Sequence, residues 1–194
     1  MTRIIAGSAR GRELKVPAKG TRPTSARVRE AMFSLLEARL GGPGGWNDLA
    51  VLDLYAGSGS LGLEAASRGA SRVVLVDSAR AAARVAQANA AALGLDDVVT
   101  VLAVKAEAVA AGARLPGLDQ PFDLVLLDPP YAVGPAELGD VLAGLAAHKL
   151  VLPDSLVVQE RAKKTVAPPW PHGWEVLPPR TYGDTVLHLA QVCP

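Results

Sequence analysis

The chain has 194 residues, of which 49% are hydrophobic and 20% are charged, and its formal net charge is +1. This length suits one well-packed domain with a small appendage, and the composition is typical of a soluble globular protein. No stretch approaches the roughly 18 uncharged apolar residues that a membrane span needs. Charged residues interrupt the N-terminal apolar segment too early for a signal peptide, so we expect a cytoplasmic protein with no membrane attachment.

Cysteine and histidine usage argues against disulfide and metal chemistry. The single cysteine, Cys193, is the penultimate residue, so no intrachain disulfide can form. His148, His172 and His188 are scattered without the spacing of metal ligands. We therefore expect no metal site.

A basic N-terminus contrasts with a mildly acidic remainder. Residues 1–30 contain eight Lys or Arg and two Glu, a charge of +6, which leaves −5 for the rest of the chain. A protein that binds a polyanion with one face has this kind of asymmetry. Charge alone leaves a solvated arm as an equally good explanation.

The first 45 residues predict a hairpin followed by a helix. Short β-type runs at 3–6 and 12–16 flank a glycine-containing turn. A loop with proline and glycine at 17–23 leads to a helix that Ser25 could cap and that the glycine-rich segment 41–45 ends. We interpret residues 1–45 as a hairpin-and-helix extension of the main domain.

From residue 46 to residue 194, apolar β-type runs alternate with alanine-rich helical patterns. Such runs linked by helices indicate a parallel sheet covered on both faces. The expected strands span 50–54, 72–76, 98–102, 122–127, 155–159, 174–177 and 185–191, and the expected helices span 60–68, 78–93, 106–111 and 135–148. The last two strands have only a short link, so they must pair as an antiparallel edge hairpin. This α/β pattern, a seven-stranded mostly parallel sheet, describes the Rossmann-like class I methyltransferase fold.

A glycine loop, Gly57-Ser58-Gly59, follows the first of these strands. With Gly62, and with Asp77 about 20 positions later, it matches a dinucleotide fingerprint. Asp53 within the strand, separated from the glycines by a small spacer, favours S-adenosylmethionine instead. There the glycines let the backbone approach the ligand, and the carboxylate can pair with its α-ammonium group. A purely structural strand-to-helix turn is the alternative.

Two further positions complete the predicted cofactor site. Asp77 ends the second strand and is placed to accept hydrogen bonds from both ribose hydroxyls, although it could instead cap the next helix. Lys105 stands where an acidic or amide side chain would be expected for the adenine amine, which leaves the Ala106 backbone for that edge. The predicted cofactor-binding residues are Asp53, Tyr55, Ala56, Gly57, Ser58, Gly59, Asp77, Ser78 and Ala106.

The segment Asp128-Pro129-Pro130-Tyr131 carries the predicted catalytic chemistry. The Asp128 carboxylate and the Pro129 carbonyl can accept both hydrogens of an exocyclic amine and direct its lone pair toward a methyl sulfonium. The prolines stiffen the turn, and the Tyr131 ring offers an extruded base a stacking contact worth about 1–3 kcal/mol. A tight turn that merely ends a buried strand is the alternative.

Several motifs together resemble one known family. They are Arg3-Ile-Ile-Ala-Gly7, Arg10-Gly11, Arg22-Pro-Thr24, Arg27-Val-Arg-Glu30 with Phe33, Asp53-Leu-Tyr-Ala-Gly-Ser-Gly59, Leu61-Gly-Leu-Glu-Ala65, Asp128-Pro-Pro-Tyr131 and Tyr182-Gly-Asp-Thr185. Nearly end to end, the chain resembles the RsmD family of bacterial 16S rRNA guanine-N2 methyltransferases. It departs from the usual family pattern at Ala26 and Ser34.

The resemblance implies that S-adenosylmethionine methylates one guanine, conventionally numbered 966, in the 16S rRNA of an assembled or assembling 30S subunit. Arg10, Arg12, Arg22 and Arg27 are then candidate phosphate contacts. So small an enzyme should recognise a folded RNA surface, with ribosomal proteins as candidate further partners, and flip the guanine into its pocket. We expect it to act as a monomer.

Three rival functions fit the sequence less well. A DNA amino-methyltransferase uses the same amine chemistry, but no separate target-recognition domain fits in this length. A nicotinamide-dependent oxidoreductase would leave the Asp128–Tyr131 segment without a role. A non-catalytic RNA-binding module should have lost Asp53 or Asp128, and both are present.

Overall fold

The structure, a computed structural model, describes residues 2–16 and 26–194. The expected loop at 17–23, the helix cap Ser25 and the candidate RNA contact Arg22 lie outside the described residues. None of the helices in those two ranges has the length and apolar character needed to cross a membrane.

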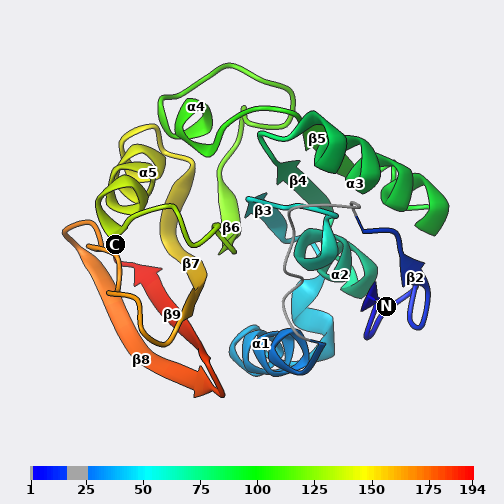
Figure 1. Ribbon diagram of the computed structural model, residues 1–194, viewed down its shortest axis with the longest axis horizontal. Coiled ribbons are helices and arrows are strands. Elements are labelled where there is room, and N and C mark those ends of the chain that lie inside the picture. Colours follow the sequence, from blue (N-terminus) through cyan, green and yellow to red (C-terminus); the bar gives the residue numbers. More distant parts are fainter. Residues whose placement is uncertain (1, 17–25) are drawn as a thin grey trace.

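A seven-stranded sheet forms the centre of the molecule (Figure 1). Its strands are β3 (Ala50–Leu54), β4 (Arg72–Val76), β5 (Val99–Leu102), β6 (Phe122–Leu127), β7 (Val151–Ala162), β8 (Trp174–Tyr182) and β9 (Thr185–Val192), in the order β5-β4-β3-β6-β7-β9-β8. The strands from β3 to β7 are parallel to their neighbours, and β9 is antiparallel to both β7 and β8. The predicted mostly parallel sheet with an antiparallel edge hairpin is confirmed.

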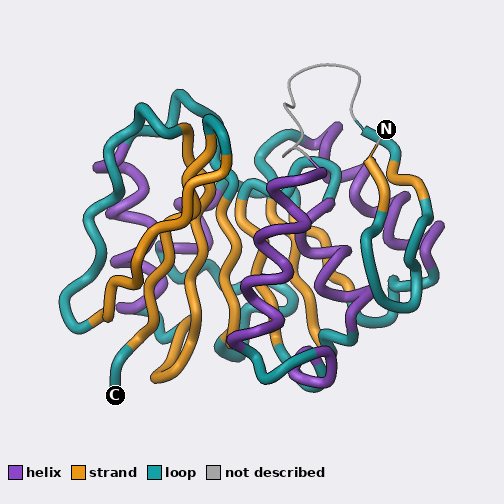
Figure 2. Tube along the Cα trace, turned by 90° about the horizontal axis from the view of Figure 1, so that it is seen from below, coloured by secondary structure: helices purple, strands orange, loops and turns teal. Residues whose placement is uncertain are grey.

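Helices cover both faces of this sheet, and in Figure 2 they lie in front of and behind its strands. They are α1 (Ala26–Arg39), α2 (Ser60–Arg68), α3 (Arg80–Leu93), α4 (Ala106–Ala110) and α5 (Pro135–Ala147), with a 3₁₀ turn η1 (Pro43–Trp46) after α1. Apolar residues of α1, α2 and α3 pack on one face, and those of α4 and α5 pack on the other. Residues of β3 alternate between these two layers, with Val51 in the first and Leu52 in the second, so burial on both faces explains the continuous apolar runs.

Two strands near the C-terminus are longer than predicted. β7 extends the expected 155–159 to Val151–Ala162, and β8 extends the expected 174–177 to Trp174–Tyr182. The ladder between β8 and β9 shifts register between Leu177 and Arg180, which accommodates the two intervening prolines. β8 is an edge strand with no neighbour on its outer side. Prolines, which lack an N–H group, therefore cost no hydrogen bonds on that side. The expected link at 178–184 is therefore mostly strand.

The predicted N-terminal hairpin is present, but its strands β1 (Thr2–Arg3) and β2 (Glu13–Leu14) are only two residues long. Between them Ile4 forms backbone hydrogen bonds with Gly11 and Arg12, and α2 holds the rest of the turn. The fully buried Glu64 carboxylate accepts hydrogen bonds from the N–H groups of Ile5 (2.7 Å) and Ala6 (3.0 Å). The Ser67 hydroxyl accepts one from the Ala9 N–H at 3.0 Å and donates one to the Ala6 carbonyl at 2.6 Å. The hairpin is thus bound to the main domain by buried polar contacts, while the division at residue 45 stays a prediction.

Candidate active site

A cavity of about 910 Å³ lies at the carboxyl ends of the central parallel strands. Its walls come from the glycine loop, the start of α3, the Asp128–Tyr131 loop, the end of β7 and the turn between β8 and β9. Val16 from the hairpin and Arg27 from α1 complete the wall. Because β3 pairs with both β4 and β6, this is the point where the strand order reverses, the usual ligand site of open α/β sheets.

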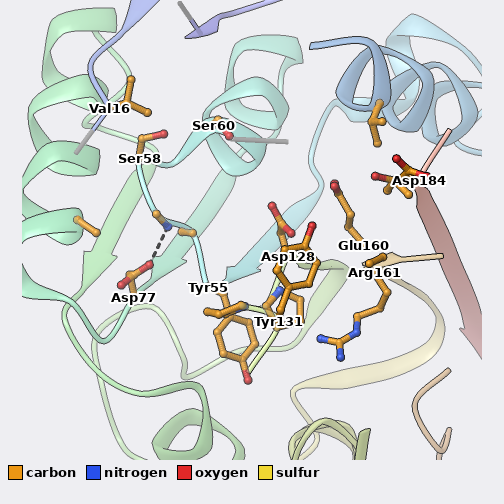
Figure 3. A pocket seen from close by; sticks show the side chains of 18 of the residues that line it. Val16, Tyr55, Ser58, Ser60, Asp77, Asp128, Tyr131, Glu160, Arg161 and Asp184 are labelled. Carbon is orange, nitrogen blue, oxygen red and sulfur yellow. Dashed lines mark hydrogen bonds between the residues drawn. The ribbon is translucent and has the colours of Figure 1, made fainter. Parts of the chain in front are cut away.

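Strand register places four residues in a row along this edge. Leu54 of β3 is aligned with Val76 of β4 and Leu127 of β6, and Leu127 is aligned with Gln159 of β7. The residues that directly follow these four aligned positions are Tyr55, Asp77, Asp128 and Glu160. All four line the cavity, and Figure 3 shows their side chains around it.

Tyr55 turns the chain sharply after β3, with a φ of 67° in the left-handed region that an aromatic residue rarely adopts. Its hydroxyl is buried and has no hydrogen-bond partner among the described residues. Burial raises the pKa of Tyr55 above its ordinary value, and the nearby carboxylates Glu107 and Glu137 raise it further. The Tyr55 hydroxyl lies on the same side of the cavity as Arg161, and the positive charge of Arg161 opposes this increase in the pKa of Tyr55.

Asp77 joins the glycine loop to the start of α3. Its Oδ2 accepts a hydrogen bond from the Gly57 N–H at 2.8 Å (Figure 3), and its Oδ1 accepts one from the Ala79 N–H at 2.8 Å. α3 begins at Arg80, two residues later than predicted, because Asp77 first makes this tight turn. A carboxylate offers about four lone-pair sites, so the predicted ribose contact is compatible with these bonds.

Glycine is needed at different positions around the loop for different physical reasons. Gly59 precedes α2 with a φ of 82°, and a Cβ there would lie 2.9 Å from Leu75 Cδ1. Gly62 is in the first turn of α2, where a Cβ would lie 2.2 Å from Leu75 Cδ2. Close packing of α2 against β4 therefore requires both, whereas Gly57 lines the cavity. Ala56, Ser58 and Ser78 of the predicted cofactor site also line it.

Asp53 lies beneath the cavity and is not part of its wall. It is 0% exposed, and its Oδ2 accepts a hydrogen bond from the Gly62 N–H at 2.9 Å. No described residue is hydrogen-bonded to its Oδ1. Burial raises the pKa of Asp53 to about 8; the Gly62 N–H opposes this shift, and the charges of Asp128 and Asp77 add to it. The structure thus shows a buried carboxyl group behind the glycine loop, and its predicted contact with an ammonium group stays a prediction.

Ala106 lies apart from the cavity. It begins α4, where its side chain is buried in the layer formed with α5. Lys105, immediately before it, is exposed. A contact between the Ala106 backbone and an adenine edge remains a prediction.

The predicted catalytic loop opens into the cavity. Asp128, Pro129, Pro130 and Tyr131 all line it, directly after β6. Pro129 is buried, whereas Tyr131 is 60% exposed at the rim. Figure 3 shows Asp128 and Tyr131 side by side, across from the glycine loop. The site therefore has one half built by backbone and another built by side chains.

Sequence reasoning missed Glu160 and Arg161 at the end of β7. Arg161 is only 4% exposed and donates a hydrogen bond from Nη2 to the Val133 carbonyl at 2.9 Å, just beyond the catalytic loop. Burial lowers the pKa of Arg161, while Tyr55, Asp128 and Tyr131 oppose the shift. The available signal was a charged pair directly after an apolar strand, at the edge where ligands bind. The expected strand ended at Gln159, so this pair lay outside it.

The candidate RNA contacts occupy different positions. Arg27 lines the cavity, and Arg10 is exposed in the hairpin turn. Arg12 is exposed as well, but its Nη2 donates a hydrogen bond to the Ala92 carbonyl near the end of α3, at 2.6 Å. Arg12 therefore also anchors the hairpin to the main domain.

Negative charge predominates around the glycine loop. Asp77 lines this half of the cavity and Asp128 faces it, whereas Asp53 beneath the loop is mostly neutral near pH 7 because burial raises its pKa to about 8. Such an environment fits a ligand that carries ammonium or sulfonium charges, because carboxylates attract them. It does not suit a pyrophosphate, which like charges would repel. No group of three or more acidic, His or Cys side chains in the described ranges is arranged to hold a metal ion.

The family model described as Conserved hypothetical protein 95 matches residues 2–191. Ribosomal RNA small subunit methyltransferase D of Escherichia coli is 32% identical over 192 residues, which cover 97% of this chain and 89% of that protein. The chain belongs to the RsmD family.

Solved structures agree with this membership. The RsmD-family fold of this chain matches the methyltransferase yhhF of Escherichia coli with a TM-score of 0.81 and 29% identity, over 100% of this chain and 98% of that chain. It matches the protein TTHA0928 of Thermus thermophilus with a TM-score of 0.80 and 34% identity, over 99% of this chain and 100% of that chain. The similarity includes the hairpin as well as the sheet, since almost the whole chain is covered in both cases.

Proposed function

We propose that this RsmD-family protein transfers a methyl group from S-adenosylmethionine to the exocyclic N2 amine of a guanine in 16S rRNA, at the position conventionally numbered 966. One observation carries the proposal: the Asp128–Tyr131 loop and the glycine loop open into the same cavity. The groups that would accept the amine hydrogens and the loop that would hold the cofactor therefore face each other.

The residues around the glycine loop fit S-adenosylmethionine. Asp77 would accept hydrogen bonds from the ribose hydroxyls, and residues 56–58, which line the cavity, would contact the methionine part. Asp53 lies beneath the loop with an Oδ1 that no described residue binds, and a cationic ligand above it would favour its charged form. When bound, the cofactor supplies a methyl group activated by its sulfonium charge.

The residues of the catalytic loop would position the amine rather than activate it strongly. Asp128 and the Pro129 carbonyl accept the two amine hydrogens, which directs the nitrogen lone pair toward the methyl carbon. As the N–C bond forms and the S–C bond breaks, the amine must lose one proton, and Asp128 is placed to accept it. Tyr131 provides a stacking surface for the base at the rim.

RNA is the substrate that best suits the remaining wall. Arg27 at the cavity and Arg10 on the hairpin can contact phosphates on one side of the target. The named RsmD relative acts on small-subunit rRNA. We therefore favour a flipped guanine of 16S rRNA over a DNA base.

The decisive test is transfer of a labelled methyl group to unmodified 30S subunits, naked 16S rRNA and duplex DNA in parallel, with the product nucleoside identified. We expect N2-methylguanosine from the 30S sample, and none from the matched Asp128→Ala variant. Label only in DNA would overturn the proposal. Comparison of 30S subunits with naked rRNA shows whether ribosomal proteins take part in recognition.

A further inference from the structure

Asn89 of α3 connects two segments of the cavity wall that are far apart in sequence. It is only 2% exposed. Its Oδ1 accepts a hydrogen bond from the Lys15 N–H, and its Nδ2 donates to the carbonyls of Lys15 and Ser58, each at 2.9 Å. Both amide N–H groups and the amide oxygen are therefore used inside the protein, which marks a buried bridge rather than a surface residue.

Each end of the bridge belongs to a different part of the site. Ser58 lies in the glycine loop, beside Gly57, whose N–H is bound by Asp77. Lys15 directly precedes Val16, which lines the cavity and is 41% exposed. The paired hydrogen bonds between Asn89 and the Lys15 backbone fix the segment just after β2 at the point where it reaches the cavity. A shift of either segment therefore disturbs the contact that holds the other.

We infer that Asn89 is a positioning residue that couples the cofactor loop to the N-terminal RNA-contacting segment, so that binding at one strengthens binding at the other. The coupling rests on the proposed function for the identity of the second ligand. Its structural basis does not, because all three hydrogen bonds are internal to the chain. Coupling of this kind is reciprocal: the factor by which cofactor tightens RNA binding equals the factor by which RNA tightens cofactor binding.

The first test needs no RNA. Amide hydrogen exchange of residues 5–16 is measured in the wild-type protein with and without S-adenosylhomocysteine, the unreactive product. We expect the ligand to slow exchange at the Lys15 amide by about fivefold or more, the lower end of typical coupling factors. Unchanged exchange in the wild type overturns the inference, whatever any variant does.

Two variants separate coupling from a structural role. Asn89→Asp has nearly the same shape and can still accept from the Lys15 N–H, but it has no N–H to donate to Lys15 or Ser58. Gln87→Ala is the control, because Gln87 is an exposed amide on the same helix. We expect the effect of S-adenosylhomocysteine on hairpin exchange to disappear in Asn89→Asp and to persist in Gln87→Ala.

The second test uses RNA binding. The Kd for unmodified 30S subunits is measured with and without S-adenosylhomocysteine, and the ratio gives the coupling factor. We expect a ratio of about five or more in the wild type, and about one in Asn89→Asp. A variant that weakens both ligands but keeps the wild-type ratio would show a purely structural role and overturn the inference. Failure of the proposed function looks different: N2-methylguanosine is absent while the exchange coupling persists.

Discussion

The two halves of the cavity are built in different ways. Around the glycine loop, side chains hold the backbone in place: Asp77, half-buried in the cavity wall, binds Gly57, and the buried Asn89 binds Ser58 from behind. Across from it, the wall consists of side chains themselves, with Asp128 and Tyr131 facing the ligand space. The first half should therefore respond to changes in residues that no ligand touches. The second should respond to the loss of a single functional group.

The largest effect is expected for Asp128→Ala, which removes the amine acceptor from the side-chain half. Turnover should fall by at least about 100-fold because positioning supplies most of the catalysis. The Kd for S-adenosylhomocysteine should change by less than about threefold. Single-turnover kinetics and calorimetry measure the two quantities, and a large loss of cofactor affinity would show that the halves are not separate.

Gly7→Ala should show how much the docking of the hairpin on α2 contributes to the stability of the protein. Gly7 has a φ of 82°, and a Cβ there would lie 1.8 Å from the Ser67 carbonyl oxygen, so the hairpin cannot keep its place on α2. We expect a loss of about 2 kcal/mol or more in the free energy of unfolding. Denaturant titration measures this loss.

Gly11→Ala is the matched control for that change. Its φ is similar at 80°, but no described atom lies within 4 Å of the added Cβ. It should cost only about 1 kcal/mol, from the backbone conformation alone. Equal losses in the two variants would contradict the importance of hairpin docking.

Asp77→Ala should weaken cofactor binding about tenfold, because the Gly57 N–H loses a charged acceptor. The maximal rate with saturating cofactor should change far less than in Asp128→Ala. Asp77→Asn keeps one oxygen for a backbone N–H and should lie between the wild type and the alanine variant. Calorimetric titration of the three proteins with S-adenosylhomocysteine distinguishes these outcomes.

A further effect is a pH dependence from Asp53. Burial raises its pKa from 3.8 to about 8, so between these values the folded protein retains a proton that the unfolded chain has lost. Stability from this group is complete below about pH 4 and is lost as pH rises toward 8. Between pH 6 and pH 7 the wild type should lose up to about 1.4 kcal/mol relative to Asp53→Asn. Urea unfolding at several pH values measures the difference, and parallel curves would show that Asp53 is ionised when folded.

The sequence predicted the loops that form both halves of the site, but not which of the nearby side chains reach the cavity. β3, β4 and β6 were predicted with their observed bounds because short apolar runs ended at polar or glycine residues. The positions of the glycine loop and of Asp128 followed directly from those strand ends. Burial of Asp53 behind the loop could not be predicted, because periodicity in a strand buried on both faces does not show which side chains reach a ligand.

The missed features depend on contacts between distant segments. Glu160 and Arg161 enter the cavity only because β7 is longer than its apolar run and is aligned with β6. Glu64 and Ser67 resemble ordinary polar helix residues until the hairpin, 58 to 61 positions earlier, is seen to bind them. Such pairs have no local signature, so only the three-dimensional structure shows them.

The attachment of the hairpin to α2 also constrains the order in which the protein can be made. Residues 2–9 leave the ribosome before Glu64 and Ser67, which bind them and are synthesised about 60 residues later. Asn89, which fixes Lys15, follows later still. During translation the N-terminal segment must therefore remain undocked until the glycine loop and α2 have emerged. A nascent chain acquires its ordered N-terminal hairpin only after the βα unit that carries the glycine loop has been made.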